Sequence, residues 1–263
     1  MGLSHASQQS REGQDRCAPS PTPSAALSRQ WCEVGPMTGF ETYLGSLLGS
    51  WEALAVPHAD AKVIRHDQFL ASVSPSHPVF NNAILLDHTA VDKVRKLYAS
   101  AGPFAEWAGS AVTSGALSAQ GFALAEATHP MVCRLGAFVD GESPIHVRVV
   151  ADVPVEQIAA LNNVNKDLLV GVPGVRAFAT EGLEAGAVLI EVGGDVNVSF
   201  VATRPECRRR GLASGVLDFA LRQAREAGFQ TSSLQATTMA GGVYQRLGYV
   251  PVGTWQEWTP APS

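Results

Sequence analysis

The sequence lacks a long apolar run, a paired cysteine motif and an excess of basic charge. No stretch reaches the roughly 20 apolar residues that a membrane-spanning helix needs, so we expect no membrane segment. The four cysteines form no C-x-x-C pair and no metal-ligand spacing, and we expect reduced thiols in a cytoplasmic protein without a bound metal. The net charge of -5 and the isoelectric point near 5.8 argue against broad binding to nucleic acid or to an anionic membrane.

The first residues also lack the basic patch and apolar core of a secretory signal, so we expect none. Residues 1–36 are instead rich in Ser, Gln, Pro and Ala, a composition that buries little apolar surface, and we expect a disordered tail. The whole chain of 263 residues is 46% apolar, which suffices for one large domain or for two domains of ordinary size.

Apolar spacing and capping residues predict few elements in the first half. The stretch rich in Gly, Ala and Ser through Gly121 gives no clear element. The predicted elements are a helix at 38–54, a strand at 79–86, a helix capped by Thr89 that ends near Gly102, and a strand at 131–139 before a turn at Asp140-Gly141.

The second half is more legible. A Gly193-Gly194 turn joins two strands into a hairpin, with Val196, Val198 and Phe200 expected on one face. The order of elements predicts a mixed α/β sheet with flanking helices. The predicted elements are strands at 145–150, 187–192, 195–202, 232–236 and 249–258, and helices at 154–168, 212–227 and 241–247, of which the second ends at Gly228.

The stretch Val201–Ala213 combines the end of a strand, a turn containing Pro, a block of Arg and a Gly that opens an amphipathic helix. The first N–H groups of a helix are unpaired, and the helix dipole adds positive charge there. Glycine lets an anion approach the backbone closely, because it has no Cβ. Since the chain as a whole is acidic, the local Arg block favours a specific phosphate-bearing ligand over a polyanion.

Two motifs carry a family resemblance. Arg208-x-x-Gly211-x-Ala213 resembles the R/Q-x-x-G-x-G/A signature of the GNAT N-acetyltransferases, and the later run from Tyr244 to Tyr249 resembles their Tyr-x-x-Leu-Gly-Phe segment, with Tyr249 in place of Phe. The motifs lie about 30 residues apart on the expected elements, and the resemblance covers roughly residues 145–258. It implies the acyl-CoA N-acyltransferase fold, with acetyl-CoA as acyl donor.

The resemblance also implies roles for individual residues. The Val201 N–H would donate to the thioester carbonyl, and Tyr244 would protonate the leaving thiolate. Sheet core for Phe200 and Val201, and simple packing for Tyr244, are the alternatives. The implied cofactor-binding residues are Phe200, Val201, Thr203, Arg208, Arg209, Arg210, Gly211, Leu212 and Ala213.

The sequence assigns no general base. Glu191 and Asp195 flank the hairpin, but carboxylates at turns more often face solvent. His146 lies in a predicted strand, where a structural role is favoured. Cys207 precedes the Arg block without a nearby His partner, and we treat it as incidental.

In the first half, the segments 78–84 and 104–107 resemble the degenerate first lobe of tandem GNAT proteins, yet no R/Q-x-x-G-x-G/A occurs before residue 145. The resemblance divides the chain into a tail at 1–36, a GNAT-like lobe without a cofactor loop at 37–143, and a catalytic domain at 144–260. Asn81, Asn82 and Trp107 are candidates to face the acceptor pocket, with ordinary strand or core positions as the alternative.

We therefore expect an N-acetyltransferase that moves an acetyl group from acetyl-CoA to the primary amine of a small molecule by direct attack, with one cofactor per chain. The alternative is a non-catalytic acyl-CoA-binding sensor or partner-binding module, which the missing base leaves open. The sequence does not decide between a monomer and a homodimer.

Overall fold

The structure is a computed structural model that describes residues 39–138 and 147–261. The predicted tail, the turn at Asp140-Gly141, His146 and the predicted lobe boundary at 143/144 lie outside the described residues. Residues Thr38–Ser263 group into one compact unit. No helix in the described ranges is both long and apolar enough to cross a membrane.

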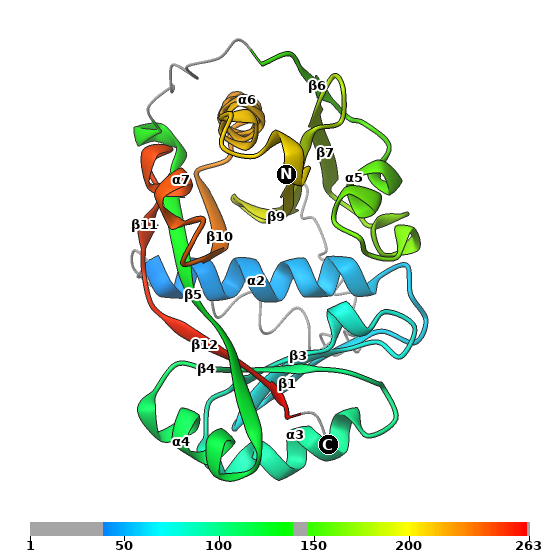
Figure 1. Cartoon of the computed structure of the whole chain (residues 1–263), viewed down its shortest axis with the longest axis vertical. Coiled ribbons are helices and arrows are strands. Elements are labelled where there is room, and N and C mark those ends of the chain that lie inside the picture. The colour runs from blue at the N-terminus through cyan, green and yellow to red at the C-terminus, as the bar shows by residue number, and fades with distance from the viewer. Residues whose placement is uncertain (1–38, 139–146, 262–263) are drawn as a thin grey trace, which may run out of the picture. The chain divides into compact units, whose positions relative to one another are not determined.

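In the first half, one helix precedes a β-hairpin, and two further helices each follow a later strand (Figure 1). Its elements are α2 (Gly39–Ala55), β1 (Lys62–His66), β2 (Phe69–Val73), β3 (Asn82–Leu85), α3 (Val91–Tyr98), β4 (Ala105–Ala108), α4 (Ala111–Ala119) and β5 (Phe122–Arg134), with short 3-10 turns at Pro78–Phe80, His88–Ala90 and Leu135–Ala137.

The second half follows the predicted alternation of strands and helices. Its elements are β6 (Val149–Ala151), α5 (Val155–Leu161), β7 (Val175–Thr180), β8 (Ala185–Val192), β9 (Asp195–Thr203), α6 (Leu212–Glu226), β10 (Thr231–Thr237), α7 (Gly241–Arg246), β11 (Val250–Pro251) and β12 (Trp255–Pro260), with 3-10 turns at Lys166–Leu169 and Pro205–Cys207.

The two halves exchange strands within a single 12-stranded sheet. The strand order is β1-β2-β3-β4-β12-β5-β10-β9-β8-β7-β6, with β11 paired to β5. The last strand, β12, therefore lies between β4 and β5 of the first half, while β5 pairs with β10 of the second half. In Figure 1 the long strand β5 runs from one half into the other. The halves cannot separate without breaking backbone ladders.

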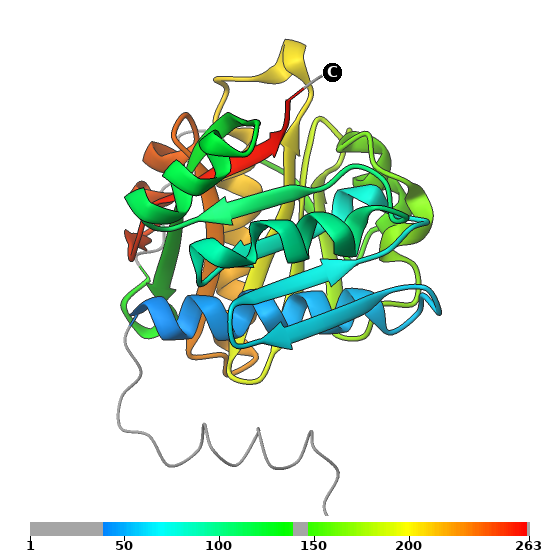
Figure 2. The same cartoon turned by 90° about the horizontal axis from the view of Figure 1, so that it is seen from below.

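Helices α6 and α2 cover opposite faces of the second half of the sheet. Leu189 on β8 packs in the core cluster that includes α6, whereas its neighbour Ile190 packs in the cluster that includes α2. This alternation is the period of two that places successive strand residues on opposite faces. A third cluster lies between α3, α4 and the first half of the sheet, the region seen from below in Figure 2.

Several elements confirm their predictions. They are the helix at the start of the described chain, the Gly193-Gly194 hairpin, α6 with Gly228 after it, and α7. Strand β10 pairs in parallel with β9, whereas β9 pairs antiparallel with β8. The mixed sheet with flanking helices confirms the predicted fold class.

Several boundaries were predicted wrongly. The helix predicted at 154–168 ends at Leu161, because Asn163 adopts a left-handed φ of 54° and the chain turns before the 3-10 turn at Lys166–Leu169. The strand predicted at 131–139 begins nine residues earlier, at Phe122, and ends at Arg134. The strand predicted at 79–86 is shortened by a 3-10 turn to Asn82–Leu85. Strands β1, β2, β4 and β7 and helix α4 were not predicted.

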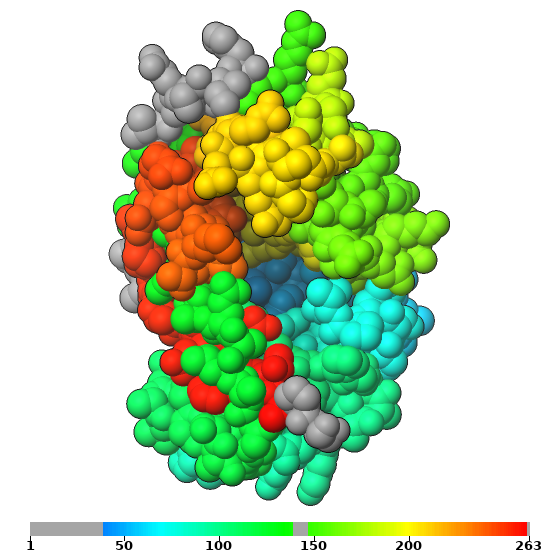
Figure 3. Space-filling model, viewed as in Figure 1, coloured from blue at the N-terminus to red at the C-terminus, as the bar shows by residue number. Residues whose placement is uncertain are grey.

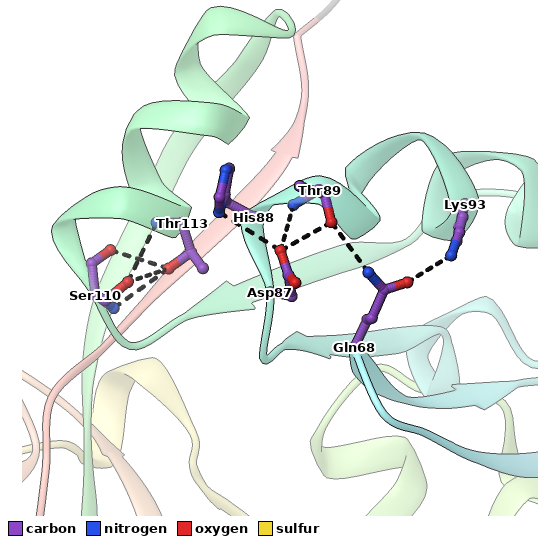
Figure 4. Close-up of polar contacts among 7 residues, drawn as sticks. All are labelled: Gln68, Asp87, His88, Thr89, Lys93, Ser110 and Thr113. Carbon is purple, nitrogen blue, oxygen red and sulfur yellow. Dashed lines mark hydrogen bonds and ion pairs between the residues drawn. The ribbon is translucent and has the colours of Figure 1, made fainter.

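The start of α3 also differs from its prediction. Asp87, not Thr89, caps the 3-10 turn that leads into this helix: its carboxylate accepts a hydrogen bond from the Thr89 backbone N–H at 2.8 Å (Figure 4). The helix ends at Tyr98, four residues before Gly102. Asp87 thus satisfies one amide of the 3-10 turn, whereas α3 itself has no side-chain cap at Ala90.

Candidate functional site

The parallel strands β9 and β10 separate after a short ladder. Only three residue pairs join them, from Thr231 with Asp195 to Ser233 with Asn197, although β9 continues to Thr203. Beyond Asn197, the edge of β9 that faces β10 has no strand partner. Unpaired backbone groups of this kind can bind an extended ligand as a further strand would.

A β-bulge interrupts the other edge of β9, where it pairs with β8. The register shifts so that Phe200 and Val201 together oppose Ala187, and Phe200 has a left-handed φ of 52°. Phe200 therefore packs in the cluster that contains α2, whereas Val196 and Val198 pack in the cluster that contains α6. The prediction that these three side chains share a face is wrong, because a bulge reverses the alternation.

Asn162, at the C-terminal cap of α5, holds the bulge. Its Nδ2 donates to the Phe200 backbone oxygen at 2.8 Å and to the Ile158 oxygen at 2.9 Å. Sequence reasoning missed this residue, because it assigned Asn162 to the interior of a longer helix. The pair Asn162-Asn163 was the available signal, since Asn tolerates the left-handed region and favours helix ends.

The loop before α6 has the conformation of an anion site. Gly211, the N-cap of α6, has a φ of 77°, and Arg209 has a φ of 61°. No side chain caps the start of α6. The first-turn amides, from Leu212 to Ser214, therefore lie uncapped at the positive end of the helix dipole. Backbone with alternating left-handed residues commonly forms a concave group of N–H donors for phosphate.

This loop borders a cleft of about 1150 Å³, which we call the cofactor cleft. Its lining includes Arg204, Arg208, Arg209 and Arg246, and the described lining residues include no carboxylate. Such a lining favours a ligand with several negative charges. The predicted cofactor residues that line this cleft are Val201, Thr203, Arg208, Arg209, Gly211, Leu212 and Ala213.

Two of the predicted cofactor residues lie elsewhere. Arg210 lines neither cavity and is close enough to Glu184 to help lower the pKa of that carboxyl, after the larger effect of the hydrogen bond from Thr180. Phe200 lines a second cavity of about 400 Å³, which we call the acceptor cavity.

The acceptor cavity is built by both halves of the chain. Asn82 and Trp107, on the adjacent strands β3 and β4, line it. Asn81 does not, because its Nδ2 donates to the backbone oxygens of Ala101 and Pro103. Sequence reasoning missed the remaining aromatic walls, which come from distant elements: Tyr43 and Trp51 of α2, and Trp255 of β12.

The two cavities meet at Val201, Thr237, Ala240 and Tyr244, which line both. Figure 3 shows a hollow between α7, α5 and the region of β9 and α6, with α2 at its floor. Tyr244 is buried, and burial raises the pKa of its phenol to about 12. The hydroxyl is protonated at neutral pH, and Tyr244 lines both cavities together with Val201 of the bulge.

The candidates for a general base lie away from this junction. Glu191 is exposed, and Asp195 is buried near the start of β9, where its Oδ1 accepts from Ser233 Oγ at 3.0 Å and burial raises its pKa to about 6. Neither lines a cavity, and the described lining residues include no Asp, Glu or His. Cys207 is buried and lines the cofactor cleft.

Comparisons with known proteins agree with this geometry. Residues 190–252 match the model of the acetyltransferase (GNAT) domain. No curated protein sequence matches the chain. Among solved structures, a GCN5-related N-acetyltransferase from Kribbella flavida is 17% identical, with a TM-score of 0.63 over 83% of this chain and 96% of that one.

Two further structures share the fold. A GCN5-related N-acetyltransferase-like protein from Streptococcus suis is 14% identical, with a TM-score of 0.59 over 84% of this chain and 99% of that one. A GCN5-related N-acetyltransferase from Sphaerobacter thermophilus is 10% identical, with a TM-score of 0.52 over 86% and 95%. The described residues thus share the fold of these GCN5-related N-acetyltransferases, and the segment that matches the acetyltransferase (GNAT) domain runs from the end of β8 to β11.

Proposed function

We propose that the protein transfers an acetyl group from acetyl-CoA to the primary amine of a small molecule by direct attack. The observation that carries this proposal is the junction of the two cavities at Val201 and Tyr244. One cavity has the charge and backbone donors for a phosphate-bearing cofactor. The other is small and enclosed by side chains from both halves, as suits an acceptor.

The cofactor cleft fits coenzyme A in three respects. The uncapped start of α6 and the left-handed Arg209 and Gly211 supply backbone donors for a pyrophosphate. The arginines Arg204, Arg208 and Arg246 supply positive charge. The unpaired edge of β9 beyond Asn197 supplies backbone groups for the amides of the pantetheine arm.

Acetyl-CoA, when bound, supplies the acetyl group as an activated thioester. In the reaction a C–N bond forms to the amine, the C–S bond breaks, and the amine loses a proton. The Val201 N–H stabilises the negative charge that develops on the acyl oxygen. Tyr244, whose phenol is protonated at neutral pH, donates its proton to the departing sulfur.

The amine proton leaves through water in this proposal, because the described lining residues offer no carboxylate or imidazole. The phenol regains its proton from solvent through the open cofactor cleft. Direct attack needs only that the acceptor and the thioester be held in line, which the meeting of the two cavities supports.

We also propose a tandem organisation, with a tail at 1–36, a GNAT-like lobe without a cofactor loop at 37–143, and a catalytic domain at 144–260. In its favour, each half contains a parallel strand pair joined by a helix: β3–α3–β4 in the first half and β9–α6–β10 in the second. The first of these units contributes Asn82 and Trp107 to the acceptor cavity.

The test measures free thiol released from acetyl-CoA with and without a panel of primary amines. Tyr244→Phe should lower kcat by about tenfold or more and leave the Kd for CoA within about twofold, because it removes the proton and keeps the ring. Equal losses in kcat and CoA affinity would assign Tyr244 to packing. CoA binding by the wild-type protein without amine-dependent thiol would contradict amine acetylation for that panel and favour a sensor role.

A further inference from the structure

We propose that the acceptor is a small monoamine whose remaining part is uncharged and carries an aromatic ring. This inference rests on the proposed function, because it names the acceptor of the same site. It follows from the charge, the hydrogen bonding and the aromatic walls of the acceptor cavity.

The acceptor cavity has no charged side chain in its described lining, whereas the cofactor cleft has four arginines. A carboxylate or a second ammonium group on the acceptor would lose its water there without gaining a partner of opposite charge. Burial of an unpaired charge is strongly unfavourable. Amino acids and polyamines are therefore poor acceptors.

The amide groups in the acceptor cavity already bond to the protein. Asn82 Oδ1 accepts from Trp107 Nε1 at 3.0 Å, and Asn82 Nδ2 donates to a backbone oxygen of its own turn at 3.0 Å. Gln235 Oε1 accepts from the Tyr43 hydroxyl at 2.8 Å, and Gln235 Nε2 donates to a hydroxyl of β5 at 2.8 Å. These bonds hold both amide groups in place and use one N–H of each.

Aromatic rings form much of the wall. Trp107 and Trp255 have ring centroids 6.4 Å apart, and Tyr43 packs edge-on against Trp255 at 5.6 Å. Trp51 completes this group from α2. Flat aromatic surfaces favour an aromatic guest, and they also attract an ammonium group before it loses its proton. The cavity volume of about 400 Å³ limits that guest to a small molecule.

Ser199 is placed to receive the amine. It lies on β9 two residues before Val201, and its Oγ donates to Asn197 Oδ1 at 2.7 Å. Asn197 is in turn held by Ser46, since its Nδ2 donates to Ser46 Oγ at 3.2 Å. With its proton committed, the Ser199 oxygen presents lone pairs to an N–H donor. The amine end of the acceptor thus lies toward β9 and the ring toward the tryptophans.

The first experiment compares four amines: 2-phenylethylamine, butylamine without the ring, phenylalanine with an added carboxylate, and 1,4-diaminobutane with a second ammonium. Binding to the CoA-saturated protein is followed by tryptophan fluorescence, and kcat/KM by thiol release. We expect the affinity and the kcat/KM for 2-phenylethylamine to be about tenfold or more above those for phenylalanine and 1,4-diaminobutane. Its advantage over butylamine should be smaller. Equal or better values for either doubly charged amine would overturn the inference.

The second experiment adds the missing charge. Asn82→Asp keeps the volume and the oxygen that accepts from Trp107 Nε1, but it places a carboxylate in the cavity. The ratio of 1,4-diaminobutane to 2-phenylethylamine in kcat/KM should rise about tenfold. Asn165→Asp makes the same change at an exposed turn outside both cavities and should leave the ratio unchanged. An unchanged ratio in Asn82→Asp, in a variant that still turns over 2-phenylethylamine, would contradict the assignment.

The two readouts separate this inference from the proposed function. Selective binding of 2-phenylethylamine without thiol release would refute acetyl transfer and uphold the cavity assignment. Thiol release with other amines, but no binding or turnover of 2-phenylethylamine, would refute the cavity assignment and uphold acetyl transfer.

Discussion

The two strand–helix–strand units of this chain share a topology but differ in how their strands part. In the first unit all four residues of β3 pair with β4, from Asn82 with Ala105 to Leu85 with Ala108. In the second unit only three of the nine residues of β9 pair with β10. A ligand can lie between strands only where the ladder is open, so the second unit alone offers an edge beside a cleft.

The turns that lead into α3 and α6 also differ. The turn before α3 is capped by Asp87, which bonds to the N–H and hydroxyl of Thr89, and Gln68 links Thr89 to Lys93 (Figure 4). The start of α6 at Gly211 has no side-chain cap. Neither Ala90 at the start of α3 nor Gly211 at the start of α6 has a side-chain cap, but α3 continues directly from a 3-10 turn whose Thr89 and Ala90 N–H groups are bonded to Asp87. The two units therefore share a topology and differ in the length of the parallel ladder and in the turn that leads into the helix.

The largest expected effect comes from closing the open helix start. Gly211→Glu places a side chain and a negative charge at the start of α6 and should weaken CoA binding by at least about 100-fold in a calorimetric titration. Gly228→Glu is the matched control, because Gly228 also has a left-handed φ, 93°, at the other end of the same helix. Binding should survive in the control. Unchanged CoA affinity in a folded Gly211→Glu protein would show that the site lies elsewhere.

A second expected effect concerns a buried carboxyl of the first unit. Glu106 on β4 is fully buried, neither oxygen has a hydrogen-bond partner among the described residues, and burial raises its pKa from 4.5 to about 8. The native state therefore binds the proton more tightly than the unfolded chain. This stability is fully present below pH 4.5 and is lost as the pH rises through about 8.

The loss should be on the order of 3 kcal/mol between pH 5 and pH 8 in denaturant titrations, and Glu106→Gln should remove that pH dependence. Glu156→Gln, on the exposed side of α5, is the control and should keep it. CoA affinity should not follow the titration of Glu106, because this residue lines neither cavity. A Glu106→Gln protein with the wild-type pH slope would refute this interpretation of the buried carboxyl.

The smallest expected effect comes from removing the cap of the 3-10 turn that precedes α3. Asp87→Ala removes the acceptor for the Thr89 N–H and should lower the melting temperature by a few degrees, without creating a second CoA site. Asp87→Asn keeps an acceptor oxygen and should lose less. If Asp87→Ala gained CoA binding, the cap rather than the closed ladder would be what excludes the cofactor from the first unit.

The sequence predicted the second unit better than the first, for physical reasons. The Gly193-Gly194 hairpin, the amphipathic α6 and the glycine after it are local features that neighbouring residues determine. Strands β1 and β2 form a local hairpin across Asp67-Gln68 that the sequence analysis overlooked. The extent of β5, by contrast, depends on partners far along the chain, since β5 pairs with both β10 and β12. Short-range patterns cannot report such pairings.

The sequence singled out a large part of the lining of the cofactor cleft, because one continuous segment, residues 201–213, supplies it. The sequence did not predict the bulge at Phe200, because the bulge depends on Asn162 at the end of α5, which donates a hydrogen bond to the Phe200 backbone oxygen. The acceptor walls were only partly foreseen, since Tyr43, Trp51 and Trp255 come together through the exchange of β12 between the halves. Distance in sequence, rather than weak chemistry, hid these residues.

The central claim is that the second unit binds one acyl-CoA and the first unit binds none. The most direct measurement is a calorimetric titration of the full chain with CoA, which reports stoichiometry and affinity together. The account predicts one CoA per chain and the loss of that one site in Gly211→Glu. Two sites per chain, or one site that Gly211→Glu leaves intact, would contradict it.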